Sequence, residues 1–599
     1  MRRTSTKAII DLYDTTAQTD GSYVANSVKS FVDLSCLDSD RESVKYATCE
    51  NNVFLLDGSF SYFPDSPDSD NFSYWSDSMS NGSGEFTVNP TLTREFTQLH
   101  SSIGITLAFD VNYPLPVKVK VSLYGYDEGY VLSNEGTYDI DTSTFFCDLP
   151  TVDYKKIVVE FIKVQPYQYA RLAGIVYGRR LEYSSDSDKN VSKARILEEV
   201  DVTSAQFKVG TSSLTIIDPD ELFSITNPSG AYSFLQKRQV IQIYEKVKTI
   251  INNVTTETEY KMAHHYIKEW STENGTISKF ESQDILGILG TTNYKGNLFS
   301  AAKVSVIVAD IMDDFGFDNY TISDEIKDIV LSGAIAPCSN REALQQVMFA
   351  CRGTIECTRD GAIRFYRIGN STSTTINRDR IFMTPKYSIT QEDLVTGVRV
   401  TAHDYVRESS LSEAYKETLG SGTYYVTFSD PFDDLEATNC TIVSYGYYHA
   451  IITVSSSAQV ILEGHKYRDY TSIYEMNSDE VRAGTEANVK EVKSATLVSK
   501  TNAFGIASYL YNFYQYRLKH KLKIIYGAEK VGSFSVIENK NGLASAILES
   551  LDIDLTGGFI ATIEATGYSL SINENDFMQE TYIGSGEYIL YSGDQLGVI

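Results

Sequence analysis

The stretch IKDIVLSGAIAPCSNREALQQVMFACRGTIECTRDGAIRFYRI, residues 326–368, carries the clearest local structure signals in the chain. Ser339 and Glu342 stand three residues apart, which is the spacing of a capping box at the start of a helix. Apolar residues then recur at helical spacing: Ala343, Leu344, Val347, Met348 and Cys351. The pattern predicts one short helix with an apolar face and a defined first turn.

A β-hairpin is predicted directly after this helix. Gly353 stands where a helix C-terminal cap belongs, and two runs rich in β-forming residues follow, Thr354–Thr358 and Ala362–Ile368. Asp360 and Gly361 lie between these runs, and Asp-Gly is typical of a tight hairpin turn. The stretch therefore predicts a helix and a hairpin, and nothing in it indicates catalysis.

Length and charge limit the class of protein. A chain of 599 residues should hold several domains, and a hydrophobic fraction of 42% is enough to build substantial cores. The net charge is −27, from 52 basic and 79 acidic residues, which argues against nucleic acid or an anionic membrane as the main partner. It fits a soluble protein, or one that lines a passage repelling DNA.

Cysteine usage and the N-terminus indicate a reduced cytosolic product. The seven cysteines form no C-x-x-C pair, which is typical of free, mostly buried thiols. The first residues, MRRTSTKAIIDLYD, lack the apolar run of a secretory signal peptide. No stretch approaches the roughly 18 apolar residues that a membrane span needs, so we expect no membrane segment.

The hydrophobic pattern predicts a mainly β chain with α insertions, an α+β class. Short alternating strands such as Ile103–Phe109 and Val117–Tyr124 indicate an N-terminal β-sandwich. Two β-barrel-like units are expected to follow, flanking a helical and hairpin insert. The predicted division is an N-terminal arm (1–50), a β-sandwich accessory domain (51–183), a linker (184–194), a first barrel (195–281), the insert (282–386), a second barrel (387–568) with a helix at 502–520, and a C-terminal tail (569–599).

The motifs of common enzymes are missing from the sequence. There is no G-x-S-x-G, no H-E-x-x-H, no P-loop and no dinucleotide-binding glycine pattern. The acidic loop at Asp65, Asp68 and Asp70 is typical of a solvated turn, although a carboxylate pair for glycoside hydrolysis stays an open alternative. We expect no catalytic residue, no metal and no cofactor.

Aromatic residues in the predicted sandwich allow two interpretations. Tyr74 and Trp75 lie beside Asp77, and exposed rings next to a carboxylate can stack on a sugar and bind its hydroxyl groups. The other interpretation is that Trp75 fills the sandwich core, and we favour it. A glycan contact at Tyr74, Trp75 and Asp77 remains the alternative.

Several segments resemble the hub proteins of phage tails and of phage tail-like particles of Gram-positive bacteria. They are Tyr266–Trp270 (YIKEW), Asp284–Leu289 (DILGIL), the stretch 326–368, Ala495–Tyr511, and Leu551–Phe559 (LDIDLTGGF). The resemblance covers about 195–568. The N-terminal domain is similar to a β-sandwich module of such tail proteins, at Leu56–Phe60, Tyr74–Ser76, Gly104–Leu107 and Arg171–Ile175. Minimal hubs lack this N-terminal region.

The resemblance implies a function. It implies two hub-type barrels per subunit and a homotrimer whose pseudo-sixfold ring joins the sixfold tail tube to a threefold spike or tip. The implied partners are the tail tube protein, the spike or tip protein, the tape measure protein and other baseplate proteins, with DNA only passing through the lumen. The implied location is the virion tail. The residues that carry the hub motif are Ser339, Glu342, Leu344, Val347, Asp360, Gly361, Gly557 and Gly558.

Two other functions stay open at this point. One is a receptor- or glycan-binding tail protein that acts on a cell-surface glycan through the N-terminal sandwich. The other is a tail-associated cell-wall hydrolase.

Overall fold

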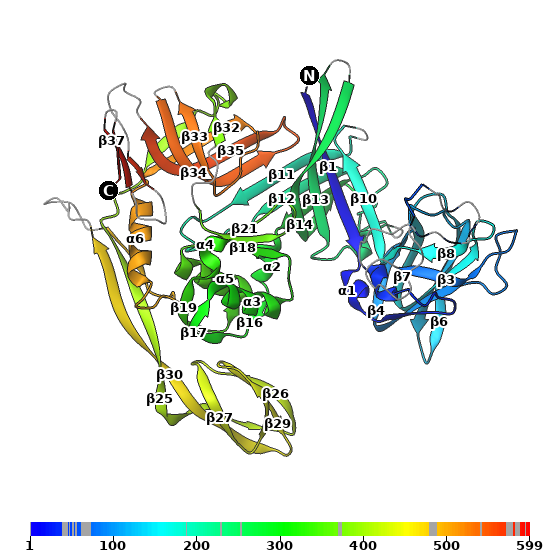
Figure 1. Ribbon diagram of the computed structural model, residues 1–599, viewed down its shortest axis with the longest axis horizontal. Coiled ribbons are helices and arrows are strands. Elements are labelled where there is room, and N and C mark those ends of the chain that lie inside the picture. Colours follow the sequence, from blue (N-terminus) through cyan, green and yellow to red (C-terminus); the bar gives the residue numbers. More distant parts are fainter. Residues whose placement is uncertain are drawn as a thin grey trace.

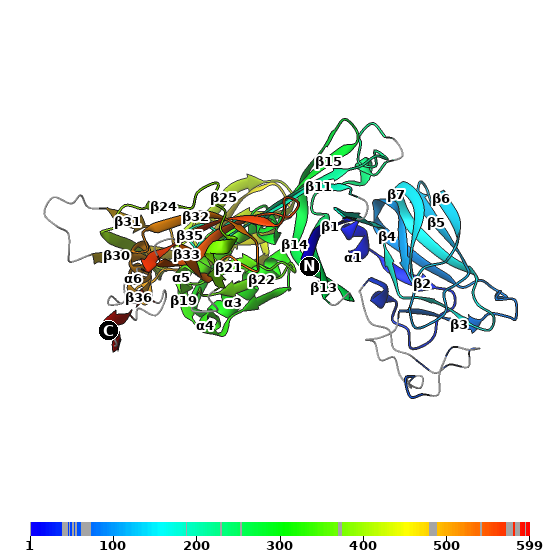
Figure 2. The same ribbon diagram turned by 90° about the horizontal axis from the view of Figure 1, so that it is seen from above.

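The computed structural model gives the fold of most of the chain (Figures 1 and 2). It describes residues 2–38, 46, 48, 50, 53, 57–60, 73–186, 189–227, 230–251, 254–368, 374–477, 488–539, 542–570, 579–581, 588–592 and 595–598. The acidic loop at 65–70 and most of the predicted C-terminal tail lie outside these residues. Three short strands are described in the tail: β36 (Gln579–Thr581), β37 (Tyr588–Ser592) and β38 (Gln595–Val598).

One sheet of thirteen strands joins segments from both ends of the chain. Its strands are β1 (Arg2–Tyr13), β10 (Gly178–Ser184), β11 (Val191–Glu199), β12 (Thr211–Ile217), β13 (Val240–Ile251), β14 (Val254–Glu273), β15 (Ile277–Gln283), β23 (Thr374–Ile376), β24 (Ser388–Gln391), β32 (Leu518–Ile525), β33 (Phe534–Asn539), β34 (Gly542–Asp554) and β35 (Ile560–Leu570). The main path runs β10-β1-β13-β14-β15-β12-β11-β34-β35-β32-β24, and β33 and β23 extend it beside β34. A 3₁₀ turn, η2 (Tyr232–Phe234), precedes β13.

The prediction of a mainly β chain with helical insertions is confirmed, but the two barrels are not separate closed barrels. Strands from both predicted barrels share the large sheet, because β11 pairs antiparallel with β34 from Arg195↔Asp554 to Glu199↔Ser550. Ile196 and Ile553 are directly opposite each other and fully buried in one core. Among the described residues, the two ends of this sheet, β10 and β24, do not pair with each other.

The first residues of the chain are an inner strand of the large sheet. Residues 1–50 were predicted to be an arm, and within them β1 lies between β10 and β13. The chain then enters the sandwich through α1 (Thr15–Thr19), β2 (Ser22–Ala25) and the 3₁₀ turn η1 (Leu34–Asp38). His100 of the sandwich holds α1, because its Nδ1 lies 3.0 Å from Asp14 Oδ2 and its Nε2 lies 2.9 Å from Asp20 Oδ2. The N-terminal segment therefore ties the sandwich to the large sheet.

The N-terminal sandwich lies at one end of the molecule (Figures 1 and 2). Its remaining strands are β3 (Tyr74–Met79), β4 (Thr91–Ala108), β5 (Lys118–Tyr126), β6 (Tyr130–Asp139), β7 (Thr144–Lys163), β8 (Tyr169–Leu172) and β9 (Gly174–Val176). A six-stranded sheet, β2-β4-β7-β5-β6 with β9 beside β4, faces the pair β3-β8 across a separate core.

The helical insert lies beside the large sheet (Figure 1). It holds α2 (Ile285–Leu289), β16 (Asn293–Tyr294), β17 (Asn297–Lys303), α3 (Val304–Phe315), β18 (Tyr320–Ile322), α4 (Asp324–Lys327), β19 (Val330–Ile335), β20 (Cys338–Ser339), α5 (Asn340–Cys351), β21 (Thr354–Cys357) and β22 (Ile363–Tyr366), with the 3₁₀ turn η3 (Arg378–Arg380) after it. Its own apolar core includes Leu344 and Val347, both fully buried.

Helix α5 begins with the predicted capping box and ends one residue earlier than expected. Ser339 N donates to Glu342 Oε2 at 3.0 Å, and Glu342 N donates to Ser339 Oγ at 3.2 Å. The left-handed residue at the C-terminus is Arg352, with φ 57°, and the following Gly353 N donates to Met348 O at 2.8 Å. The backbone N–H groups of Arg352 and Gly353 therefore close the last turn of the helix.

A long two-stranded ribbon projects from the predicted second barrel (Figure 1). Its strands are β25 (Gly397–Leu419) and β30 (Ala458–Asn477), with β31 (Val489–Val492) beside β25. The far end carries β26 (Gly422–Thr427), β27 (Phe432–Thr438), β28 (Thr441–Tyr445) and β29 (His449–Val454) around a small core.

The helix predicted at 502–520 is shorter in the structure. Helix α6 covers Ala503–Tyr514, and Leu518 already begins strand β32. Leu522 and Ile524 alternate with exposed or half-buried lysines along β32, which is the period of a strand. The position of Leu518, four residues after Tyr514, extended the helical pattern by coincidence.

No helix among the described residues is long and apolar enough to cross a membrane.

Candidate functional site

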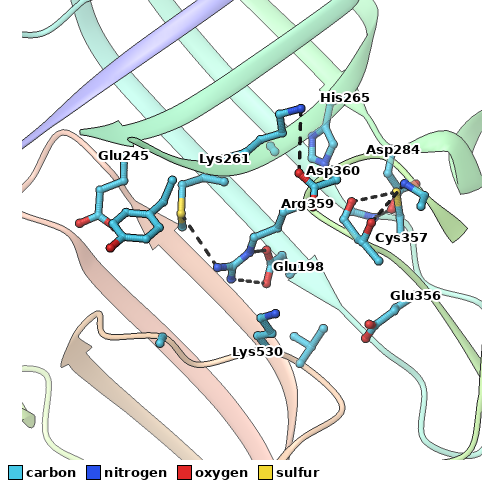
Figure 3. A pocket seen from close by; sticks show the side chains of 18 of the residues that line it. Glu198, Glu245, Lys261, His265, Asp284, Glu356, Cys357, Arg359, Asp360 and Lys530 are labelled. Carbon is cyan, nitrogen blue, oxygen red and sulfur yellow. Dashed lines mark hydrogen bonds and ion pairs between the residues drawn. The ribbon is translucent and has the colours of Figure 1, made fainter. Parts of the chain in front are cut away.

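A cavity of about 1120 Å³ lies where the insert meets the large sheet (Figure 3). Its walls come from the β13–β14 hairpin, the β21–β22 hairpin, the end of β11 and the residues after β32. The predicted turn at Asp360 projects into it, so the hairpin singled out in the sequence forms one wall. The cavity brings together segments that lie far apart in the sequence.

Arg359, next to the hairpin turn, connects three of these walls. Its guanidinium donates two hydrogen bonds to the Glu198 carboxylate of β11, at 2.6 and 2.9 Å. It also donates to Tyr526 Oη at 2.6 Å and to the Glu529 carbonyl oxygen at 3.3 Å. The bidentate pair is the geometry in which arginine binds a carboxylate most strongly. Arg359 thus locks the insert onto both halves of the large sheet.

The turn itself packs directly on strand β14. Gly361 has φ 93°, which favours glycine, and a Cβ at this position would lie 2.8 Å from His264 Cδ2. Asp360 is exposed, and its Oδ1 lies 4.0 Å from Lys261 Nζ, a distance at the limit of an ion pair. Asp360 and Gly361 therefore place Arg359 through the shape of the turn and add little energy of their own.

Burial shifts the pKa values of three titratable groups in the cavity wall, Asp284, His265 and Cys357. Asp284 is buried at the start of α2, where Gly210 N and Gly287 N donate to its carboxylate at 2.7 and 3.2 Å. Burial raises the pKa of Asp284 to about 7 and lowers the pKa of His265 to about 3. Burial also raises the pKa of the Cys357 thiol far above its ordinary value. The thiol is therefore protonated at neutral pH and is a poor nucleophile.

The arrangement in the cavity is that of a structural junction. Seven carboxylates and four basic side chains line it, and pairs such as Arg359–Glu198 and Arg364–Glu356 neutralise part of this charge. Within the part of the chain that the structure describes, no group of three or more His, Cys, Asp or Glu side chains could hold a metal ion. The walls hold each other in place through charge pairs and packing.

The other residues singled out in the sequence lie elsewhere. Ser339 is the N-cap of α5, and Glu342, Leu344 and Val347 lie within that helix; none of the four lines the cavity. Gly557 and Gly558 form the turn between β34 and β35, where Gly557 N donates to Asp554 Oδ1 at 2.8 Å and Gly558 has φ 98°.

In the sandwich, Tyr74 and Trp75 are 0% and 4% exposed, while Asp77 is exposed. Tyr74 packs in the sandwich core, whereas Trp75 packs in a separate apolar cluster with Phe31, Tyr46, Val53 and Tyr113, so neither ring offers a face to a ligand. Trp75 is therefore buried beside the sandwich core and does not fill it. Of the three residues considered for a glycan contact, only Asp77 is exposed at the surface.

Arg359 and Glu198, which hold the junction, could not be identified from the sequence. They stand 161 positions apart, and each looks like an ordinary charged residue of a β segment. The only local signal was the position of Arg359 directly before the Asp-Gly turn, which puts its side chain at the tip of a rigid hairpin.

The neutral, buried His265 predicts a pH dependence of stability. In the folded state the His265 imidazole has a pKa of about 3, whereas in the unfolded state its pKa is near 6.5. Between these values the unfolded state binds more protons, so stability falls as the pH is lowered. We expect wild type to lose roughly 1.4 kcal/mol per pH unit below 6.5 relative to His265→Gln.

Denaturant unfolding of both proteins at pH 7.5, 6 and 5 measures this difference. The contribution of Asp284, which has the opposite sign, is common to both proteins and cancels. A difference between the two proteins that stays constant over this range would contradict the prediction.

Comparison with known proteins finds likeness in structure and none in sequence. No protein-family model matches the chain, and no curated protein matches it. Solved structures that resemble it include phage tail proteins. The 43 kDa tail protein of prophage MuSo2 from Shewanella oneidensis is 8% identical with a TM-score of 0.38, covering 64% of this chain and 95% of that chain. The tail protein from Neisseria meningitidis MC58 is 9% identical with a TM-score of 0.39, covering 64% and 93%.

The prophage tail protein gp18 from Listeria monocytogenes EGD-e is a third such structure. It is 10% identical with a TM-score of 0.36, covering 64% of this chain and 91% of that chain. Identities and TM-scores this low add no argument about what the chain does.

Proposed function

We propose that the chain is a structural hub of a phage tail or tail-like injection particle, and that it has no enzymatic role. In this proposal three copies form a pseudo-sixfold ring that joins the sixfold tail tube to a threefold spike or tip. The segments 195–281 and 387–568 build the ring, the insert 282–386 braces it, and the sandwich 51–183 is an accessory module. The proposed class of protein rests on the resemblance of segments within 195–568 to the hub proteins of phage tails.

One observation carries the structural part of the proposal, namely the single sheet that runs through both ring segments and is locked by Arg359. A continuous backbone ladder with a braced insert makes a stiff wall, which suits a part that transmits load between tube and spike. The open ends of such a sheet must be covered, and neighbouring subunits of a ring can cover them. The cavity beside the Arg359–Glu198 ion pair is lined by further charge pairs and by the protonated Cys357 thiol, which suits a site that holds the insert against the sheet.

The proposed partners follow from the same role. They are the tail tube protein above, the spike or tip protein below, and the tape measure and other baseplate proteins, with the virion tail as the location. DNA would only pass through the lumen. The net charge of −27 supports this part, because an acidic wall repels the phosphate backbone.

Imaging of the intact particle by electron cryomicroscopy tests the proposed function. We expect three copies of the chain on the tail axis, between tube and spike. Six copies at the periphery would contradict a hub. A position at the outer tips of receptor-binding fibres would instead favour the receptor- or glycan-binding alternative.

A further inference from the structure

The two ends of the large sheet differ in what covers them. At one end, β10 is in contact with the sandwich: Thr106 Oγ1 donates to the Gly178 carbonyl oxygen at 2.6 Å, and the Arg179 guanidinium lies 5.0 Å from the Phe146 ring centroid. At the other end, all four residues of β24 are exposed. No strand among the described residues pairs with the outer edge of β24. An unpaired edge presents free backbone N–H and C=O groups to another strand.

The uncovered end also exposes apolar side chains. Met383 is 86% exposed in the segment before β24, Ile389 of β24 is 44% exposed, and Ile525 at the end of β32 is 49% exposed. Natural proteins protect an unpaired edge with charges, prolines or a covering element. Apolar side chains on an open edge therefore indicate a surface that another chain covers.

A strip of positive charge follows the same edge. Residues 378–393 and 517–525 hold seven basic side chains and three acidic ones, Asp379, Glu392 and Asp393: the basic residues are Arg378, Arg380, Lys386, Arg517, Lys519, Lys521 and Lys523. Ion pairs within the chain neutralise three of them, Arg380, Lys519 and Lys521. The other four form no ion pair among the described residues. Lys386 is exposed, and Lys523 lies half-buried beside Phe382.

This strip is unusual in a chain that carries a net charge of −27. Two copies of so acidic a chain repel each other over most of their surfaces. A stable contact between copies therefore needs a local surface of the opposite sign, and the strip beside β24 is such a surface. The acidic remainder of a second copy complements it, whereas a nucleic acid or an anionic membrane would be repelled by the rest of the chain.

We propose that the β24 edge is the docking surface for a second copy of this chain. The second copy adds an extended strand to the sheet beside β24, covers Met383 and Ile389, and places acidic side chains against Lys386 and Lys523. This inference rests on the proposed function in so far as that function requires several copies. It goes further by naming the edge that makes the contact.

Charge reversal at the strip tests the proposal in the full-length chain. The variant Lys386→Glu/Lys523→Glu removes two positive charges that have no ion pair in the described structure. The control is Lys208→Glu/Lys237→Glu, which makes the same charge change at two exposed lysines away from this edge. Self-association of wild type, variant and control is measured by analytical ultracentrifugation at low and high salt.

We expect wild type to self-associate, and more weakly at high salt because salt screens the contact. The variant should dissociate at a protein concentration at least about tenfold higher than wild type, and the control should match wild type. Hydrogen exchange over residues 388–391 should be slower in associated wild type than in the dissociated variant. Matching thermal unfolding of the three proteins shows that the substitutions leave the fold intact.

The outcomes separate this inference from the proposed function. Association of the variant equal to that of wild type, with fast exchange at 388–391, would overturn the β24 edge and leave a hub built through another surface. A wild type that stays monomeric at every concentration would also overturn it. The proposed function fails separately, on the copy number and position of the chain in the imaged particle.

Discussion

Replacing Arg359 by alanine is expected to lower the free energy of the first unfolding transition by about 3 kcal/mol. The substitution leaves the Glu198 carboxylate without its bidentate partner at the wall of the junction cavity, where its side chain is 18% exposed. Breaking a buried ion pair by removing one partner costs roughly 3–5 kcal/mol. The lower end applies because both side chains retain some contact with water. Tyr526 and the Glu529 carbonyl lose a donor as well.

In Arg359→Ala the loss of stability should first appear around the junction, before the whole chain unfolds. We expect hydrogen exchange to accelerate first in the hairpin 354–366 and in β11, because Arg359 is the side chain that ties them together. The control is Lys303→Ala, which breaks the ion pair to Asp328 at 2.7 Å between side chains that are 56% and 59% exposed. Exposed pairs contribute roughly 0–1 kcal/mol, so the control should stay close to wild type. Equal losses in the two variants would contradict the role of Arg359.

Signals that lie within one element could be predicted from the sequence. The capping box at Ser339 and Glu342 and the turn at Asp360 and Gly361 depend on residues at most three positions apart, so their chemistry is visible in a short window. The mainly β class was predictable for the same reason, because alternation of apolar and polar residues has the period of a strand.

Partners across the chain could not be predicted in this way. The alternation in β11 and β34 shows which face of each strand is buried, and it does not show which strand lies beside it. The pairing of Ile196 with Ile553 therefore remained hidden, and two barrels were expected where one sheet runs through both. The same reason applies to the Arg359–Glu198 lock, since a charged residue gives no local sign of a distant partner.

Replacing Trp75 by alanine is expected to destabilise the sandwich by about 3–5 kcal/mol. The indole is 4% exposed and packs edge-on against Tyr113 and Phe31, at centroid distances of 5.1 and 5.7 Å. The Arg171 guanidinium lies 4.0 Å from the centroid of the Trp75 ring and forms a buried ion pair with Glu50. Removal of the ring leaves a cavity and uncovers this charge pair. Both effects destabilise the folded domain.

The measurement separates a core role for Trp75 from a sugar-binding role. Thermal unfolding followed by hydrogen exchange over residues 73–186 should show the sandwich opening at a lower temperature in Trp75→Ala. The control is Tyr126→Ala, in which an aromatic side chain that is 56% exposed is removed from the same domain; its effect should stay within roughly 1 kcal/mol. A Trp75→Ala protein as stable as the control that loses binding on a glycan array would show a ligand contact. A loss of stability would mean that any loss of binding reports the damaged core.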